Sequence, residues 1–315
     1  MTLPILLYSS ENNDGGRMSS ALVVKEFNGY GNLPAVSVEN QASGITNIRK
    51  AFVKITDISN PIITKALVYL RKENDLPDTY ALLTHGTQTD IVSAMESRKY
   101  STGKLTSDVS VLATSLSITF HPEIIADDVI KAGDTIIITN GTLTNKAVVS
   151  STTPSANQTD IVFSPALSNS FLAADTFVAS CILTENLSAT IDNIDKSLLT
   201  TTTFDNAALE SNSIGGIEQT ITVTMLTAST FLVESDVLTE LPNGSVGADY
   251  APLNPAFFEP YFRINSSGWG GTSVANESFS FQTHPAAIPV FVSHITDAGA
   301  TGGNDLIYLA SAIEA

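Results

Sequence analysis

Acidic, amide and glycine residues crowd one short stretch near the start of the chain, ENNDGGRMS at residues 11–19. Such a composition is typical of loops that bind phosphate or a metal cation. A phosphate loop requires a preceding strand, a GK[ST] sequence and a following helix, but the basic residue here is Arg17 and no GK[ST] occurs. A calcium loop requires acidic residues at alternating positions and a distal glutamate, which Glu11 and Asp14 do not supply. The pattern therefore predicts neither site.

The same stretch has two other properties that could serve a contact. Gly15 and Gly16 allow the backbone a positive φ or a close approach to other atoms. Arg17 offers a planar fork of donors to a carboxylate or to a group of carbonyls. Two interpretations stay open, an exposed turn with a solvated arginine and an anchor that binds a neighbouring protein. In the second, the assembly contacts are Asp14, Gly15, Gly16, Arg17 and Met18.

The histidines do not form a metal-binding pattern. The chain has four of them, His85, His121, His284 and His294. His284 and His294 flank PAAIPVFVS, which is not the spacing of a known ligand pair, and neither HExxH nor a cysteine partner accompanies them. We therefore expect core or surface positions for all four.

A cluster of acidic residues in IADDVIKAGD is the remaining candidate for acid–base chemistry. Asp127, Asp128 and Asp134 lie close in sequence. Paired carboxylates can transfer protons, but aspartate also favours turns, and this segment has turn residues. No GxSxG sequence occurs, and the single cysteine, Cys181, lies in the apolar run TFVASCILT. The sequence thus predicts a protein that is not an enzyme and has no catalytic, cofactor-binding or metal-ligating residue.

Composition indicates strands rather than helices. Of the 315 residues, 43% are hydrophobic and only 15% are charged, below the roughly 25% of an average soluble domain. Serine, threonine and asparagine fill the difference, and β-branched side chains favour a pleated surface. A lone cysteine cannot form an internal disulfide, so the fold does not depend on an oxidising compartment.

The charge balance limits the kinds of partner. Fifteen basic and 32 acidic residues give a net charge of −17, whereas proteins that bind nucleic acid tightly need a basic surface. DNA and anionic membranes are therefore not expected as tight partners. An acidic surface that repels DNA and one that only confers solubility both fit. The start lacks the basic region of a signal peptide, and no apolar run approaches the ~18 residues of a membrane span, so we expect a soluble chain made in the cytoplasm.

The elements that would position these residues divide the chain into four parts. Residues 1–45 alternate short apolar runs with glycine and asparagine clusters and predict an extended N-terminal arm or loop-rich segment with one or two strands. Residues 46–120 predict an α+β region in which NIRKAFVKITDI, TKALVYLR and SLSITF are strands. Its one short helix is expected over 87–103, with a threonine cap, Asp90 in the first turn and Gly103 at the end.

The second half of the chain is expected to be β-rich. Residues 121–185 contain four short apolar runs separated by turn residues, which predicts a small β-barrel module. Residues 186–315 form a C-terminal β-rich domain whose first 31 residues, 186–216, are expected to be a connection. A weak helical pattern covers 229–241. The fold class is therefore mainly β, with several β-sandwich or small β-barrel modules and few short helices.

Three of these features, in this order, resemble a family of tailed-bacteriophage virion structural proteins. They are GGRMS within ENNDGGRMS, RKAF at Arg49–Phe52 opening a strand, and the KAGD turn at 131–134. In that family an acidic, glycine-rich GGRMS stretch precedes a strand beginning RKA, and a small β-barrel entered by a VGD-type turn follows. GDTIIITNG, AVVSS and TDIVFSPAL also resemble β modules inserted into phage coat and tail proteins. The resemblance covers about residues 5–185.

The resemblance implies a non-enzymatic structural component of the virion, in the tail baseplate or the head-to-tail neck. Its implied partners are tail tube, sheath, baseplate or neck subunits and further copies of the chain, with no cofactor. It also implies that the arm orders against a neighbouring subunit through Arg17 and Met18. The alternative is a receptor- or carbohydrate-binding module of a tail fibre, for which Tyr250, Tyr261, Phe262 and Trp269 are candidate aromatic platforms.

Overall fold

The computed structural model describes residues 5–12, 14–23, 27–28, 42–55, 63–74, 76–238, 241–300 and 306–314. The chain divides into two compact units. The first comprises Met1–Val53, Thr64–Glu185 and Ile288–Ala315, and the second comprises Lys54–Ile63 and Asn186–Ala287. Strands dominate the described residues of both units, which confirms the prediction of a mainly β chain with small barrel modules and few short helices.

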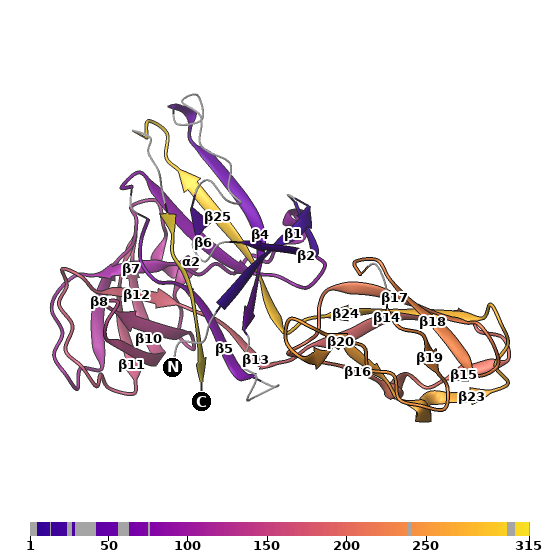
Figure 1. The fold of residues 1–315 in the computed structure, drawn as a ribbon. Coiled ribbons are helices and arrows are strands. Elements are labelled where there is room, and N and C mark those ends of the chain that lie inside the picture. The colour runs from indigo at the N-terminus through magenta and orange to yellow at the C-terminus, as the bar shows by residue number, and fades with distance from the viewer. Residues whose placement is uncertain are drawn as a thin grey trace. The chain divides into compact units, whose positions relative to one another are not determined.

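The first unit contains several sheets and one closed barrel (Figure 1). One sheet has the order β2-β1-β4-β25-β6 and another has the order β13-β5-β27. Strand β5 is almost continuously buried, as expected for an apolar strand covered on both faces. The bounds of these strands, with the short pair β3 and β26, are β1 Ile5–Asn12, β2 Gly15–Val23, β3 Phe27–Asn28, β4 Ile45–Ile55, β5 Ile63–Leu70, β6 Thr79–His85, β13 Ile182–Leu187, β25 Ala287–Thr296, β26 Leu306–Ile307 and β27 Leu309–Glu314.

The barrel is closed, with the strand order β10-β11-β8-β7-β12-β9. Along β11 the residues alternate between exposed and buried, so Ile161 and Phe163 fill the interior while their neighbours face outward. A short helix, α2, lies beside β10 and β11. The bounds are β7 Thr102–Leu105, β8 Ser115–Thr119, α2 Ala126–Val129, β9 Thr135–Thr139, β10 Thr144–Ser155, β11 Gln158–Ser164 and β12 Phe177–Ser180.

The second unit is built on a sheet with the order β14-β24-β17-β18-β19. Ile221, Val223 and Met225 alternate on the buried face of β17, as the sequence pattern predicts, and pack in an aromatic-rich core. Three short antiparallel pairs complete the unit. Its bounds are β14 Thr190–Leu198, β15 Thr202–Phe204, η2 Asn206–Ala208, β16 Leu209–Ser211, β17 Gln219–Met225, β18 Thr230–Ser235, β19 Gly244–Ser245, β20 Leu253–Asn254, β21 Glu259–Pro260, β22 Phe262–Ile264, η3 Ser266–Gly268, β23 Trp269–Gly271 and β24 Ser278–His284.

The described part of the predicted arm contains two strands of eight or more residues, β1 and β2, within the one or two expected there, and both are paired in a sheet of the first unit. Residues 5–12 and 15–23 pair as the antiparallel hairpin β1–β2, and β1 is also the sheet neighbour of β4. Backbone pairing supplies the order that the sparse apolar content of this segment did not predict, and Leu7 and Met18 are buried. Residues 24–26 and 29–41 of the predicted arm lie outside the described residues.

The predicted helix over 87–103 is wrong. The structure has one turn of 3₁₀ helix, η1 Val92–Ala94, and then enters β7. The backbone groups that an α-helix would use are bound elsewhere, since Val92 N–H donates to Asp14 O at 2.7 Å and Gly16 N–H donates to Asp90 O at 2.9 Å. Tertiary hydrogen bonds therefore override the local helical pattern.

Three further boundaries differ from the sequence-based division. The barrel takes β7 and β8 from before residue 121, because its closure needs strands from outside the predicted module. The segment 186–216 is not a plain connection but carries β14, β15, η2 and β16. Within the weak helical pattern at 229–241, Thr230–Ser235 form strand β18 and not a helix, since Phe231 and Val233 alternate inward.

Candidate functional site

A buried junction joins three stretches that are far apart in the sequence. The start of β2, the middle of β4 and the segment after β6 meet at Gly15, Gly16, Lys50 and Asp90, which we name the Lys50 junction. All four residues belong to the first unit. Two of the three stretches are those that carry the resemblance to virion proteins, GGRMS and RKA.

The glycine pair is required by close packing at this junction. Gly15 has a φ of +121° and Gly16 a φ of +89°. A Cβ atom at Gly15 would lie 2.7 Å from Asp90 O and 2.9 Å from the Cα atom of Ile91, closer than atoms of this kind approach. Gly15 therefore lets the hairpin rest directly on the backbone of residues 90 and 91.

Lys50 is the centre of the junction. Its ammonium donates to Gly16 O at 2.8 Å, to Asp90 O at 2.9 Å and to Gln88 O at 3.3 Å. The same nitrogen lies 2.6 Å from Asp90 Oδ1, and the Lys50 side chain is 0% exposed. The rings of Phe52 and Phe291 lie 5.0 and 5.6 Å from it. A cation so enclosed and so occupied by acceptors binds segments together and is not presented to a substrate.

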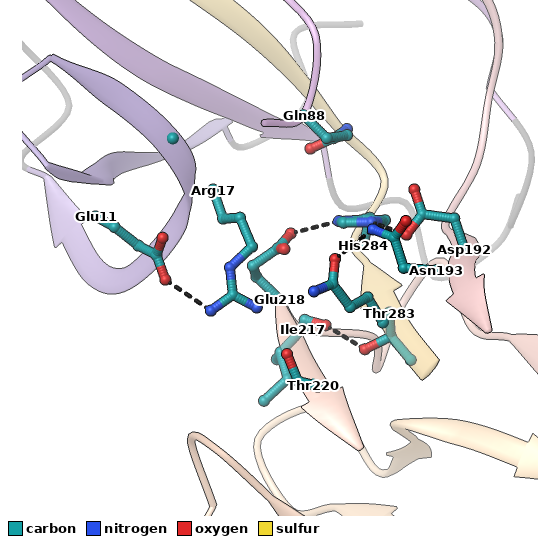
Figure 2. A network of polar contacts seen from close by, with 12 residues as sticks. Glu11, Arg17, Gln88, Asp192, Asn193, Ile217, Glu218, Thr220, Thr283 and His284 are labelled. Carbon is teal, nitrogen blue, oxygen red and sulfur yellow. Dashed lines mark hydrogen bonds and ion pairs between the residues drawn. The ribbon is translucent and has the colours of Figure 1, made fainter. Parts of the chain in front are cut away.

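The five residues predicted as assembly contacts divide into buried and exposed ones. Gly15 and Met18 are buried in this chain, so neither residue leaves surface for a neighbour to contact. Asp14 is exposed. Arg17 Nη2 donates to Glu11 Oε1 at 2.9 Å across the hairpin, and both side chains stay partly exposed (Figure 2). Asp14, Gly16 and Arg17 are therefore the members that keep accessible surface.

A second buried polar group lies in the second unit (Figure 2). His284 Nδ1 is 2.9 Å from Glu218 Oε2, and His284 Nε2 is 2.9 Å from Asp192 Oδ1. Burial lowers the pKa of His284, but hydrogen bonds and charge attraction from Glu218 and Asp192 outweigh burial and raise that pKa above its ordinary value. A ring held between two carboxylates in this way joins β14, β24 and the residue before β17.

The other candidate titratable residues do not assemble into a reactive site. Asp127 and Asp128 are exposed in α2. Asp134 instead forms an ion pair with Arg98 and accepts the Lys131 N–H at 2.7 Å, which closes the KAGD turn. Burial raises the pKa of Asp134, and these partners oppose the rise.

The described residues also lack an assembled metal-binding group and a reactive thiol. Across the residues that the structure describes, no group of three or more His, Cys, Asp or Glu side chains is placed to hold a metal ion. Cys181 is buried, and burial raises the pKa of its thiol, so it is the inert packing residue expected from its apolar surroundings. The described residues also contain no helix long and apolar enough to cross a bilayer.

The aromatic residues considered as a carbohydrate platform lie in a hydrophobic core. Phe262 and Tyr250 are buried, and Tyr250 donates its hydroxyl to Pro242 O at 2.8 Å. Trp269 packs against Phe204 and Phe231, with ring centroids 5.0 Å away in each case. Tyr261 packs against the same core, and it and Trp269 stay partly exposed. The four rings therefore contribute mainly to the core of the second unit.

One open cavity in the first unit was not expected from the sequence. It has a volume of about 530 Å³ and lies between the segment 70–81 and the barrel strands β7 and β8. Glu73, Lys104, Tyr80 and His121 are among its lining residues. The sequence offers little signal for this cavity, because its walls come from segments whose contact depends on the barrel closing. The Lys50–Asp90 pair was missed for the same reason, since its members are 40 residues apart.

Comparison with known proteins identifies no family. No protein-family model matches the chain, and no curated protein matches it. Among solved structures, the phage phi92 endosialidase has a TM-score of 0.18 at 12% identity, over 80% of this chain and 39% of that chain, so this chain spans well under half of its length. The VP16–VP17 complex of the two major capsid proteins of bacteriophage P23-77 has a TM-score of 0.18 at 8% identity, over 85% of this chain and 89% of that chain. Both of these weak neighbours are phage proteins, and neither lends this chain a role.

Proposed function

We propose that the chain is a non-enzymatic structural component of a tailed-phage particle, present in several copies in the tail baseplate or the head-to-tail neck. The observation that carries the proposal is the Lys50 junction. The GGRMS and RKA residues on which the resemblance rests are the ones that lock the hairpin β1–β2 to β4 and to Asp90.

Residues in this role maintain the fold of the first unit and do not themselves indicate a reaction. Gly15 is needed for close approach, and Lys50 is enclosed by carbonyl oxygens, a carboxylate and two rings. Close packing of this kind holds segments of the first unit rigidly together, which suits a subunit that assembles with neighbours. Tail tube, sheath, baseplate or neck subunits and further copies of the chain in a symmetric ring are the partners that fit this role.

The alternative, a receptor- or carbohydrate-binding module of a tail fibre, loses part of the aromatic platform that the sequence suggests at residues 250–269. Such a platform needs exposed rings, whereas Tyr250 and Phe262 are buried and Trp269 packs against two phenylalanines. These rings supply core packing, and the exposed ring of this segment is that of Phe258.

The proposal is tested on particles of the phage that encodes the chain. Particles purified on a density gradient and washed in high salt should retain the chain in a fixed ratio to the major tail protein, measured by quantitative mass spectrometry. Antibody-labelled electron microscopy should then place it at the baseplate or the neck. A chain absent from washed particles, or labelled only along fibres, contradicts the proposal.

A further inference from the structure

The cavity beside the barrel contains a carboxylate without a hydrogen-bond donor. Glu73 lines the cavity and is half-buried, and no described residue donates a hydrogen bond to its carboxylate. Burial raises the pKa of Glu73, and the nearby Lys104 opposes the rise. A half-buried carboxylate that lines a cavity can accept hydrogen bonds from the hydroxyl groups of a ligand.

Two cations share the cavity with this carboxylate. Lys104, on β7, lines the cavity and is exposed. Lys72 lines the same cavity, and its Nζ atom lies 3.9 Å from the ring centroid of Tyr308. Glu73 would repel an anionic ligand, and the two lysines would repel a cationic one. A hydroxyl group avoids both conflicts, because it can donate to the carboxylate and accept from an ammonium.

A pair of stacked rings forms another part of the wall. The rings of Tyr80 and His121 lie 4.6 Å apart between centroids with an interplanar angle of 25°. The His121 ring is fixed, since its Nε2 lies 2.9 Å from Pro77 O and its Nδ1 lies 3.4 Å from the Glu123 N–H. The short Nε2 contact requires the N–H to point at the carbonyl, which leaves Nδ1 as the acceptor.

The remaining lining suits the same class of ligand. Leu70, Leu76 and Ile124 add apolar surface, and a volume of about 530 Å³ falls within the usual range of small-molecule sites. Hydroxyl-rich rings with apolar C–H faces can use both the charged groups and the aromatic wall. The site is preformed, since its ring pair and its strands are already held in place, and this lowers the entropic cost of binding.

We propose that this cavity binds an uncharged sugar residue, with Glu73 and Lys104 sharing its hydroxyl groups and the stacked pair of Tyr80 and His121 lying against one side of its ring. The site is separate from the aromatic residues at 250–269 and adds a binding activity to the proposed structural role. It does not depend on that role, because none of the four residues of the Lys50 junction lines the cavity.

The test uses the full chain and a set of defined probes. Ligand-observed NMR and calorimetry are run with glucose, galactose, mannose, N-acetylglucosamine, N-acetylgalactosamine, maltose and lactose, each up to 20 mM. Glycine, lysine and N-acetylneuraminic acid serve as zwitterionic, cationic and anionic comparisons. We expect at least one neutral sugar to bind with a Kd on the order of 1 mM, and the charged probes to bind at least ~10-fold more weakly.

Variants locate the binding. Glu73→Gln keeps the side-chain shape but removes the charged acceptor, and we expect at least a ~10-fold loss of affinity. Lys104→Met is a second, surface variant with the same expected direction, so a folding defect in one does not remove the test. Glu96→Gln, an exposed glutamate outside the cavity, is the matched control and should bind like the parent chain.

Three results would overturn the proposal. The first is a folded chain that binds none of the neutral sugars at 20 mM. The second is sugar binding that survives unchanged in both Glu73→Gln and Lys104→Met, which would place the sugar elsewhere. The third is preference for glycine or for a charged probe, which would assign the cavity to another class. None of these results bears on incorporation into particles, so the structural proposal is judged separately.

Discussion

The Lys50 ammonium lies 2.6 Å from Asp90 Oδ1, and the two side chains are 0% and 11% exposed. This pair spans 40 residues of sequence and fixes the segment after β6 against β4 and β2. A buried charge that loses its partner is costly, so the pair strongly favours this one position of the hairpin within the first unit.

Removing either member of the pair should destabilise the chain strongly. We expect Asp90→Asn or Lys50→Met to lower the free energy of unfolding by about 3–5 kcal/mol, because each leaves an uncompensated buried partner. The double variant should lose less than the sum of the two single variants. Urea unfolding followed by far-ultraviolet circular dichroism measures all three, and strictly additive losses would show that the two groups do not interact.

Gly15 can be tested against a second glycine that shares its backbone conformation but not its surroundings. Gly15 and Gly133 both have positive φ, +121° and +92°. A Cβ atom at Gly133 meets nothing within 4 Å, whereas one at Gly15 meets Asp90 O at 2.7 Å. We expect Gly133→Ala to cost about 1–2 kcal/mol from φ alone and Gly15→Ala to cost clearly more. Equal losses in thermal or urea unfolding would mean that the close contact relaxes without cost.

The fate of residues 87–103 shows what limits inference from the sequence here. Ile91 and Val92 fall on one face of a helical pattern, but Ile91 is exposed and Val92 N–H donates to Asp14 O. The competing hydrogen bonds come from residues about 78 positions away, so no local signal could reveal them. By contrast, the alternation of Ile221 and Val223 is a property of adjacent residues, and it predicted β17 correctly.

The sites follow the same rule. Arg17, predicted from residue type alone, does have a carboxylate partner, but the partner is Glu11 of the same hairpin. Lys50 belongs to the quoted RKAF sequence, yet its burial depends on Asp90 and on rings from other strands. The cavity at Glu73 needs a closed barrel before it exists. Long-range pairing, and not residue chemistry, was the missing information.

Arg17 distinguishes a role in assembly from a role in the fold. Its pair with Glu11 is partly exposed, so Arg17→Ala should change stability by only about 0.2–1 kcal/mol. If Arg17 also contacts a neighbouring subunit, particle assembly should fall sharply, since truncating a buried interface charge costs about 2–5 kcal/mol per copy. Arg17→Lys should restore assembly only in part, because an ammonium lacks the planar fork.

Glu11→Gln is the matched control for this experiment. It removes the charge of the same in-chain pair but keeps Arg17. Assembly should then be near normal, measured as particle yield and infectivity beside thermal melting of each variant. Normal particles from Arg17→Ala would exclude residues 14–18 from the interface.

His284 should make the second unit less stable at high pH. Its pKa is raised in the folded chain by Glu218 and Asp192 despite burial, so folding favours the protonated ring. That contribution is fully present below the unfolded pKa of about 6.5 and is lost as the pH rises through the folded pKa. We expect the urea midpoint of the second unit to fall between pH 6 and pH 9, and His284→Gln to flatten this slope. An unchanged slope in the variant would assign the effect to other groups.

Glu277 should have the opposite pH dependence. Its carboxylate accepts the backbone N–H groups of Thr200 and Thr201 at 2.9 and 2.7 Å and that of Thr202 at 2.9 Å. Hydrogen bonds from the hydroxyls of Thr200 and Thr202 and from these N–H groups hold the pKa of Glu277 below its usual range. Stability from this site is present above the unfolded pKa of about 4.3 and is lost as the pH falls through the folded pKa.

Glu277→Gln tests this arrangement directly. The variant should lower the melting temperature at neutral pH and approach the parent chain at the most acidic pH that both tolerate. Amide exchange at residues 200–202 should accelerate, because the amide group accepts these hydrogen bonds less strongly than a carboxylate. Unchanged exchange at those amides would mean that the loop is held by other contacts.

The order of strands along the chain also governs how the first unit can form during synthesis. The barrel is encoded in one stretch, Thr102–Ser180, and can close soon after it leaves the ribosome. Strands β4 and β6 wait for β25, which ends at Thr296, 211 residues after the end of β6 at His85 (296 − 85). At about 5–20 residues per second, the edge of β6 remains open for roughly 11–42 s in each nascent chain, and that of β4 for longer. Unpaired strand edges recruit other strands, so polysomes making many copies at once should depend on chaperones that cover β4 and β6 until β25 emerges.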